Sequence, residues 1–109
     1  MDFIFNKNYL DAFGLKGLAL SELGQMPEAR IQFAKALSID STYKLTYTQL
    51  FSNYVGSNDL VEAEKILDLL LSKYPDYEEG LSFKARLYLN QKKYDKAIVY
   101  ADKLLKLKK

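Results

Sequence analysis

Residues 92–97 read Lys-Lys-Tyr-Asp-Lys-Ala, and two earlier stretches have the same layout. Residues 58–63 read Asn-Asp-Leu-Val-Glu-Ala, and residues 24–29 read Gly-Gln-Met-Pro-Glu-Ala. Each stretch begins with polar or turn-forming residues and ends in an alanine, and the three alanines stand 34 residues apart. A fixed interval of this size indicates a stacked repeat array, in which each repeat covers the apolar face of its neighbour.

Other residues keep the same frame. Tyr9, Tyr43 and Tyr77 are also 34 residues apart. Between these markers, apolar residues recur with the spacing of a helix rather than a strand. We therefore expect six helices, near residues 10–23, 26–39, 44–57, 60–73, 78–91 and 94–107.

The apolar stripes of these helices predict the core. In the last pair of helices, the expected core residues are Leu81, Ala85, Tyr88, Leu89, Tyr94, Ala97, Ile98, Ala101, Leu104 and Leu105. The breaks at residues 40–42 and 74–76 supply side-chain oxygens that are expected to cap the helix that follows. Pro27 suits the first turn of a helix, where a missing amide donor costs nothing.

The interval separates related architectures. HEAT and armadillo repeats need about 40–47 residues, whereas a helix–turn–helix repeat of 34 residues has the length of a tetratricopeptide repeat. The chain resembles three such repeats, over 10–43, 44–77 and 78–109. The positions that match the small or large packing residues of the family are Gly17, Ala29, Phe33, Ala36, Ala63, Leu67, Ala85 and Ala97, and Pro75 matches its terminal proline.

The resemblance implies an all-α solenoid of three antiparallel helix hairpins, wound as a right-handed superhelix with a concave groove. Some residues depart from the family pattern. Lys16 and Lys84 stand where leucine is usual, and Phe51 stands where a small residue is expected. These departures predict locally looser packing.

Residues 3–9 align with residues 37–43, largely apolar on apolar and polar on polar. Residues 1–9 therefore resemble the tail of a preceding repeat, and no polar capping helix follows the last repeat. We expect the chain to be a segment of a longer array. The alternative is a complete small protein with a frayed N-terminal arm.

The composition excludes several kinds of chemistry. Cysteine and histidine are absent, so thiolate chemistry, metal sites built on these residues, and the commonest general base are missing. The glycine pair Gly14 and Gly17 lies inside an expected helix, where close packing explains it better than phosphate binding. The carboxylates are expected on solvated faces. We therefore expect no enzyme activity, no catalytic residue, no metal and no cofactor, and no membrane span in this segment.

Charge is distributed unevenly. Residues 78–109 carry nine Lys or Arg against four Asp or Glu, whereas the two earlier repeats are net acidic. The excess either attracts an acidic partner or suits the negative end of the last helix dipole. Nucleic-acid binding is not expected, because phosphate contacts need basic residues along the whole groove.

The family resemblance assigns a peptide-binding groove to the first helix of each hairpin. Its expected residues are Asp11, Leu15, Leu18, Glu22, Leu45, Thr48, Gln49, Ser52, Glu79, Ser82, Phe83, Arg86 and Asn90. Four of them are apolar and lie off the hairpin stripe, which favours a partner that covers them. The positions at which some relatives clamp a terminal carboxylate carry no suitable charge here, because Glu79 would repel it.

Two functions are therefore open. The first is a non-catalytic scaffold that binds a peptide or helical segment of a protein partner in the groove. The second is a spacer or self-association element that forms homo-oligomers by stacking its uncovered end helices. The sequence names neither the partner nor the compartment.

Overall fold

The computed structural model describes residues 7–108 and contains six helices there, without any strand. They are α1 (Lys7–Glu22), α2 (Met26–Ile39), α3 (Lys44–Gly56), α4 (Leu60–Lys73), α5 (Glu78–Asn90) and α6 (Tyr94–Lys106). The all-α prediction is confirmed, and the observed bounds agree closely with the expected ones. The main difference is at the start, where α1 begins at Lys7 rather than near Leu10. The rest of the expected N-terminal tail, residues 1–6, lies outside the described residues.

The turns explain why the helices end where they do. Gly24, Asn58 and Lys92, again at the repeat interval, have φ values of 81°, 58° and 61°. This left-handed conformation ends an α-helix. The next helices then start at once, and Pro27 lies in the first turn of α2 as expected.

The residues directly before α3 and α5 do not cap these helices with their own side chains. Tyr43 and Tyr77 precede α3 and α5, and neither makes a side-chain capping hydrogen bond. The carboxylate of Asp40 instead accepts a hydrogen bond of 2.9 Å from the amide of Thr42. It therefore closes its own turn, because a carboxylate two residues away from an amide competes well for it.

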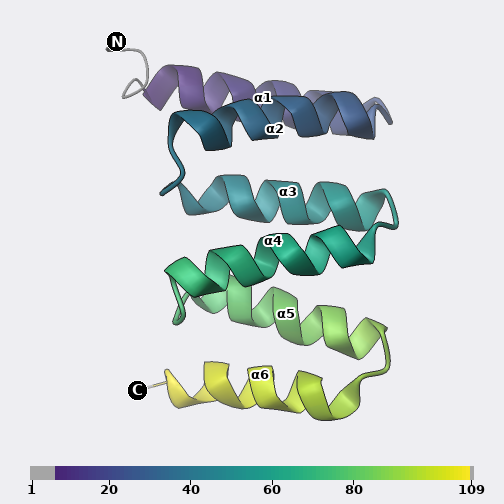
Figure 1. The fold of residues 1–109 in the computed structure, drawn as a ribbon, viewed down its shortest axis with the longest axis vertical. Helices are drawn as coiled ribbons and strands as arrows, with labels where there is room; N and C mark the ends of the chain where they lie inside the picture. Colours follow the sequence, from purple (N-terminus) through teal and green to yellow (C-terminus); the bar gives the residue numbers. More distant parts are fainter. Residues whose placement is uncertain (1–6, 109) are drawn as a thin grey trace. The chain divides into compact units, whose positions relative to one another are not determined.

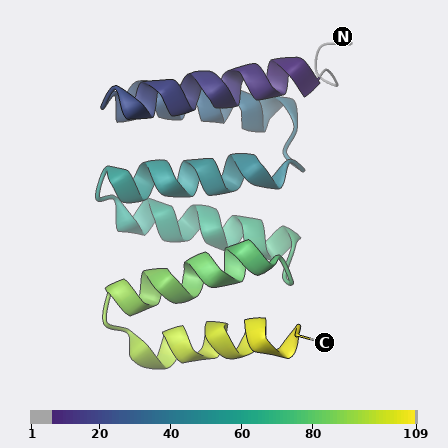
Figure 2. The same ribbon diagram turned by 180° about the vertical axis from the view of Figure 1, so that it is seen from behind.

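The chain divides into two compact units, an N-terminal unit that ends at Ala63 and a C-terminal unit that begins at Glu64. In the N-terminal unit, α1 and α2 run antiparallel and α3 packs on α2 (Figure 1, Figure 2). Gly17 of α1 faces the ring of Phe33, so closely that a β-carbon at this position would overlap the ring. A small residue opposite a large one therefore sets the α1–α2 distance.

The C-terminal unit contains most of α4 and the antiparallel pair α5 and α6 (Figure 1). Gly80 of α5 lies against Leu71 of α4, where a β-carbon would be 2.9 Å from a methyl group. Leu81, Tyr88 and Ala97 are buried, as the apolar stripes predicted.

Four of the expected core residues are exposed instead. The exposed fractions are 54% for Leu89, 56% for Tyr94, 58% for Ile98 and 64% for Leu105. The helical stripe was identified correctly, but a stripe is buried only where another element lies on it. Between residues 7 and 108, these side chains remain largely uncovered.

Candidate binding surface

A shallow hollow lies between α1 and α3 in the N-terminal unit. It has a volume of about 240 Å³ and is lined by Leu10, Asp11, Gly14, Leu15, Leu18, Tyr43, Leu45, Thr46 and Gln49. Five of these residues are among those predicted for the groove, and they define what we call the α1–α3 surface: Asp11, Leu15, Leu18, Leu45 and Gln49.

Helix geometry explains why these five residues meet. Asp11, Leu15 and Leu18 are three or four positions apart, so α1 presents them on one face. Leu45 and Gln49 are related in the same way on α3. The two helices lie close together at Gly14, where a β-carbon would be in van der Waals contact, at 3.4 Å, with the side-chain amide of Gln49.

The α1–α3 surface is apolar and accessible. Leu15 is 65% exposed, and Leu18 and Leu45 are each 45% exposed. Three exposed leucines around one hollow, with the carboxylate of Asp11 and the amide of Gln49 beside them, combine apolar contact area with a few polar groups. This is the composition of a site that takes an apolar side chain and fixes its orientation by hydrogen bonds.

The other predicted residues of this unit lie elsewhere. Glu22 and Ser52 are exposed but do not line the hollow. Thr48 is buried, and its hydroxyl donates a hydrogen bond of 2.9 Å to the carbonyl of Leu45 in its own helix. Thr48 therefore offers little to a ligand, because its one donor is already used and its side chain is covered.

The five predicted residues of α5 belong to the C-terminal unit. Ser82 and Arg86 line a second hollow, between α5 and α6. Glu79 is exposed and accepts a hydrogen bond of 3.2 Å from the hydroxyl of Tyr77. Phe83 is half-buried, and Asn90 is exposed at the last position of α5.

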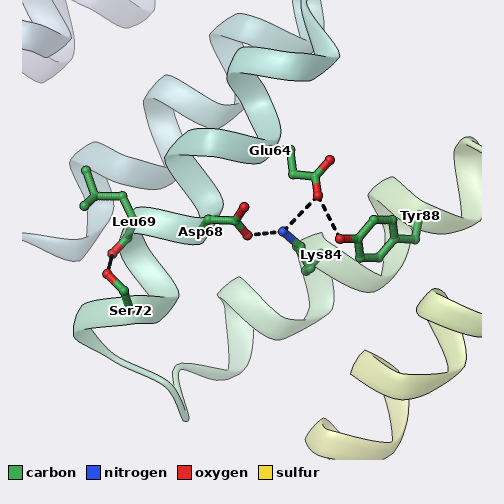
Figure 3. Close-up of polar contacts among 6 residues, drawn as sticks. All are labelled: Glu64, Asp68, Leu69, Ser72, Lys84 and Tyr88. Atoms are coloured by element: carbon green, nitrogen blue, oxygen red, sulfur yellow. Dashed lines mark hydrogen bonds and ion pairs between the residues drawn. The ribbon is translucent and has the colours of Figure 1, made fainter.

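The sequence analysis missed a polar cluster at the junction of α4 and α5, which we call the Lys84 cluster. Lys84, only 1% exposed, lies between Glu64 and Asp68 of α4 (Figure 3). Its ammonium forms ion pairs with both carboxylates, at 3.4 Å to Glu64, and the hydroxyl of Tyr88 donates a hydrogen bond of 2.7 Å to Glu64. The predicted loose packing at Lys84 is wrong, since partners on α4 hold the ammonium.

These contacts shift the acidities of the cluster. The hydrogen bond from Tyr88 lowers the pKa of Glu64, with a further contribution from the charge of Lys84. Burial by itself lowers the pKa of Lys84, but the hydrogen bond and charge of Asp68 outweigh it, so that the pKa is raised. At neutral pH Glu64 is therefore a carboxylate and Lys84 an ammonium, and the two charges attract each other. We assign this cluster to packing, because it holds two helices together and does not open into either hollow.

Other sites are not evident in the described part of the chain. Residues 7–108 hold no group of three or more acidic, cysteine or histidine side chains placed to share a metal ion. In the same range, no helix has both the length and the apolar character of a membrane span.

Comparison with known families shows a match. A model of the tetratricopeptide repeat matches residues 10–43 and 79–109, which together make up more than half of the chain. No curated protein matches the chain at a significant level.

Proposed function

Because the chain belongs to the tetratricopeptide repeat family, we propose that it is an interaction module that binds a peptide segment of a protein partner on the α1–α3 surface. Tetratricopeptide repeats generally mediate protein–protein interaction, and they typically do so without catalysis. The partner is therefore a protein. The part of the proposal that is new for this chain is the place and chemistry of the contact.

One observation supports this place: the exposed apolar side chains around the hollow are themselves residues predicted for the groove. Leu15, Leu18 and Leu45 expose large apolar side chains around a hollow of about 240 Å³. Exposed apolar groups gathered at one place indicate a binding surface, whereas single exposed leucines do not. An apolar side chain of the peptide would enter the hollow and cover the three leucines.

The polar groups beside the hollow fix the rest of the contact. The amide of Gln49 can donate to and accept from a peptide backbone, and it already lies where α1 and α3 approach. The carboxylate of Asp11 favours a basic residue next to the apolar one. The proposed ligand is thus a short segment with one apolar anchor and an adjacent positive charge.

A test starts from a random peptide library displayed on phage and selected on the protein. We expect the enriched peptides to share an apolar residue and to bind less tightly after Leu18→Asp combined with Leu45→Asp. The loss should be at least tenfold, or about 1.4 kcal/mol, because both substitutions place charges against the anchor. Fluorescence anisotropy of a labelled peptide measures it.

The matched control is Ile31→Asp. Ile31 is 54% exposed on α2 and does not line the hollow, so binding should be unchanged. Far-UV circular dichroism should show unaltered helix content in all variants. Undiminished affinity of the Leu18 and Leu45 variant would contradict the proposed place, and the absence of any enriched peptide would contradict the proposed ligand.

A further inference from the structure

The two junctions seen within the units show how a helix is seated on the hairpin before it. In the N-terminal unit, Arg30 of α2 donates hydrogen bonds to Asn53 at 2.8 Å and Ser57 at 3.1 Å, and its guanidinium lies 4.5 Å from the ring centre of Tyr54. In the C-terminal unit, Glu64 of α4 contacts Lys84 and Tyr88 of α5. Arg30 and Glu64 occupy the same repeat position, 34 residues apart, as do Tyr54 and Tyr88.

The α5–α6 pair has a comparable surface, and it is left uncovered within the described residues 7–108. Its hollow has a volume of about 630 Å³ and is lined by Ser82, Ala85, Arg86, Leu89, Tyr94, Ala97, Ile98, Ala101, Leu104 and Leu105. Two of the equivalent positions in the N-terminal unit lie against α3: Gly14, where a β-carbon would be 3.4 Å from the side chain of Gln49, and Arg30, which bonds to Asn53. The α5–α6 hollow is therefore shaped for a helix that sits as α3 does.

Helix α1 exposes the stripe that such a helix needs. On α3, Asn53 contacts Arg30 of α2, and Thr46, Tyr47 and Leu50 have the helical spacing of the same face and are also buried. The residues 34 positions earlier are Ala12, Phe13, Lys16 and Ala19, and all of them are exposed or half-buried. Leu20 and Leu23 extend this stripe, and Leu23 is 71% exposed.

The side chains that would meet are chemically matched. The position of Arg30 and Glu64 is Ile98 on α6, and the position of Tyr54 and Tyr88 is Leu20 on α1. Ile98 and Leu20 would thus form an apolar contact at the position where Arg30 meets Tyr54 and Glu64 meets Tyr88. Ile98 is 58% exposed, so it gains from such a contact.

The charged positions match as well. Asp68 and Lys84 form an ion pair between α4 and α5. Their equivalents are Asp102 on α6 and Lys16 on α1, again an aspartate and a lysine, and both are exposed. At the junction of α2 and α3 the same positions hold Ala34 and Leu50, so an ion pair is not a fixed property of the repeat.

We propose that the chain self-associates head to tail, with α1 of one copy seated on the α5–α6 hollow of another. Lys16 of the first copy pairs with Asp102 of the second, and Ile98 contacts Leu20. The two surfaces differ, so the contact is heterologous, and a pair of copies still has one free surface of each kind, the α5–α6 hollow of the first copy and the α1 face of the second. The average particle mass therefore rises steadily with concentration rather than stopping at a dimer.

The test is charge reversal followed by sedimentation velocity over a concentration series of the full 109-residue chain. Lys16→Asp alone, or Asp102→Lys alone, puts like charges together at every interface and should raise the apparent dissociation constant at least tenfold. The combination of both substitutions in one chain restores opposite charges and should restore association. Mixing the two single variants at equal amounts should also restore it, since each interface then again pairs opposite charges.

A matched control is Lys73→Asp, which makes the same change of charge at an exposed residue of α4 and should not alter association. A chain that remains monomeric at all concentrations overturns the proposal, as expected if another protein or further repeats occupy these faces instead. The proposal is also overturned if the single reversals leave association unchanged, or if neither the double variant nor the mixture restores it. In either case the copies meet through other surfaces.

Discussion

The junction of α2 with α3 and the junction of α4 with α5 occupy the same repeat positions but use opposite chemistry. Arg30 is the central group of the first, where it bonds to Asn53 and Ser57 and lies over Tyr54. In the second, an acidic residue takes the place of Arg30, and the buried Lys84 replaces Leu50. The difference shows that the 34-residue repeat determines which positions of two helices are in contact. The side chains at these positions differ between the junctions and are complementary within each one.

The largest effect is expected from removing the carboxylates of the Lys84 cluster. Glu64→Gln combined with Asp68→Asn leaves a buried ammonium without a compensating charge. The free energy of unfolding should fall by about 3 kcal/mol. Urea denaturation followed by circular dichroism measures this change.

Lys84→Met is the matched control for that experiment. It removes the buried charge and leaves carboxylates whose side chains are 29% and 57% exposed, so that water can solvate them. The unfolding free energy should change by no more than about 1 kcal/mol. A larger loss from Lys84→Met than from the double substitution would show that Lys84 is held by packing of its stem and not by its charge.

A smaller effect is expected at the first junction. Arg30→Met removes two hydrogen bonds and leaves the side-chain oxygen of the buried Asn53 without its donor. The amide nitrogen of Asn53 keeps its bond of 2.9 Å to the carbonyl of Met26. We expect a loss of about 1–2 kcal/mol in the same denaturation assay. Lys35→Met, at an exposed residue of α2, serves as the control, and equal midpoints for the two variants would contradict the role of Arg30.

The smallest effect is a difference in acid sensitivity. The folded state lowers the pKa of Glu64 from its ordinary value of 4.5, chiefly through the hydrogen bond from Tyr88. Glu64 therefore contributes stability that is present above pH 4.5 and is lost as the pH falls through the lowered pKa. The contribution should be below about 1 kcal/mol, because the carboxylate is partly exposed.

Unfolding of the wild type and of Glu64→Gln at a series of pH values measures the contribution of the Glu64 carboxylate to stability. The stability gap between them should close as the pH falls from neutrality through the lowered pKa. The gap between the wild type and Arg30→Met should stay constant, since no carboxylate pairs with Arg30 in the described contacts. A gap for Glu64→Gln that widens in acid would mean that the pKa is shifted in the other direction.

The helices were predictable from the sequence, because their causes are local. The repeat interval, the turn residues near Gly24, Asn58 and Lys92, and the 3.6-residue spacing of apolar positions fix six helices within a few residues of the observed bounds. The pattern could not predict which apolar stripes are covered by another helix. Leu89, Tyr94, Ile98 and Leu105 lie on a correct stripe, but burial depends on a second surface that the stripe does not specify.

The candidate site was predictable in part. Helical periodicity placed Leu15, Leu18 and Leu45 together, and the hollow between α1 and α3 unites them with Asp11 and Gln49. Thr48 shares that spacing, yet its hydroxyl bonds within its own helix. The Lys84 cluster was missed because its partners are 16 and 20 residues away, across a junction whose register the interval alone does not supply. The available signal was a lysine at an apolar position, with Glu64 and Asp68 one turn apart on the preceding helix.

The buried ammonium of Lys84 also restricts how this array can be shuffled by recombination. If the α5–α6 hairpin followed α2 directly, Lys84 would face Ala34 and Arg30 in place of Asp68 and Glu64. A desolvated ammonium beside a guanidinium, in place of two carboxylates, would oppose folding even though the 34-residue period was intact. The order of the repeats therefore depends on matched side chains at each junction as well as on chain connectivity. A repeat moved to a new place would be tolerated only after the facing residues of both repeats had changed.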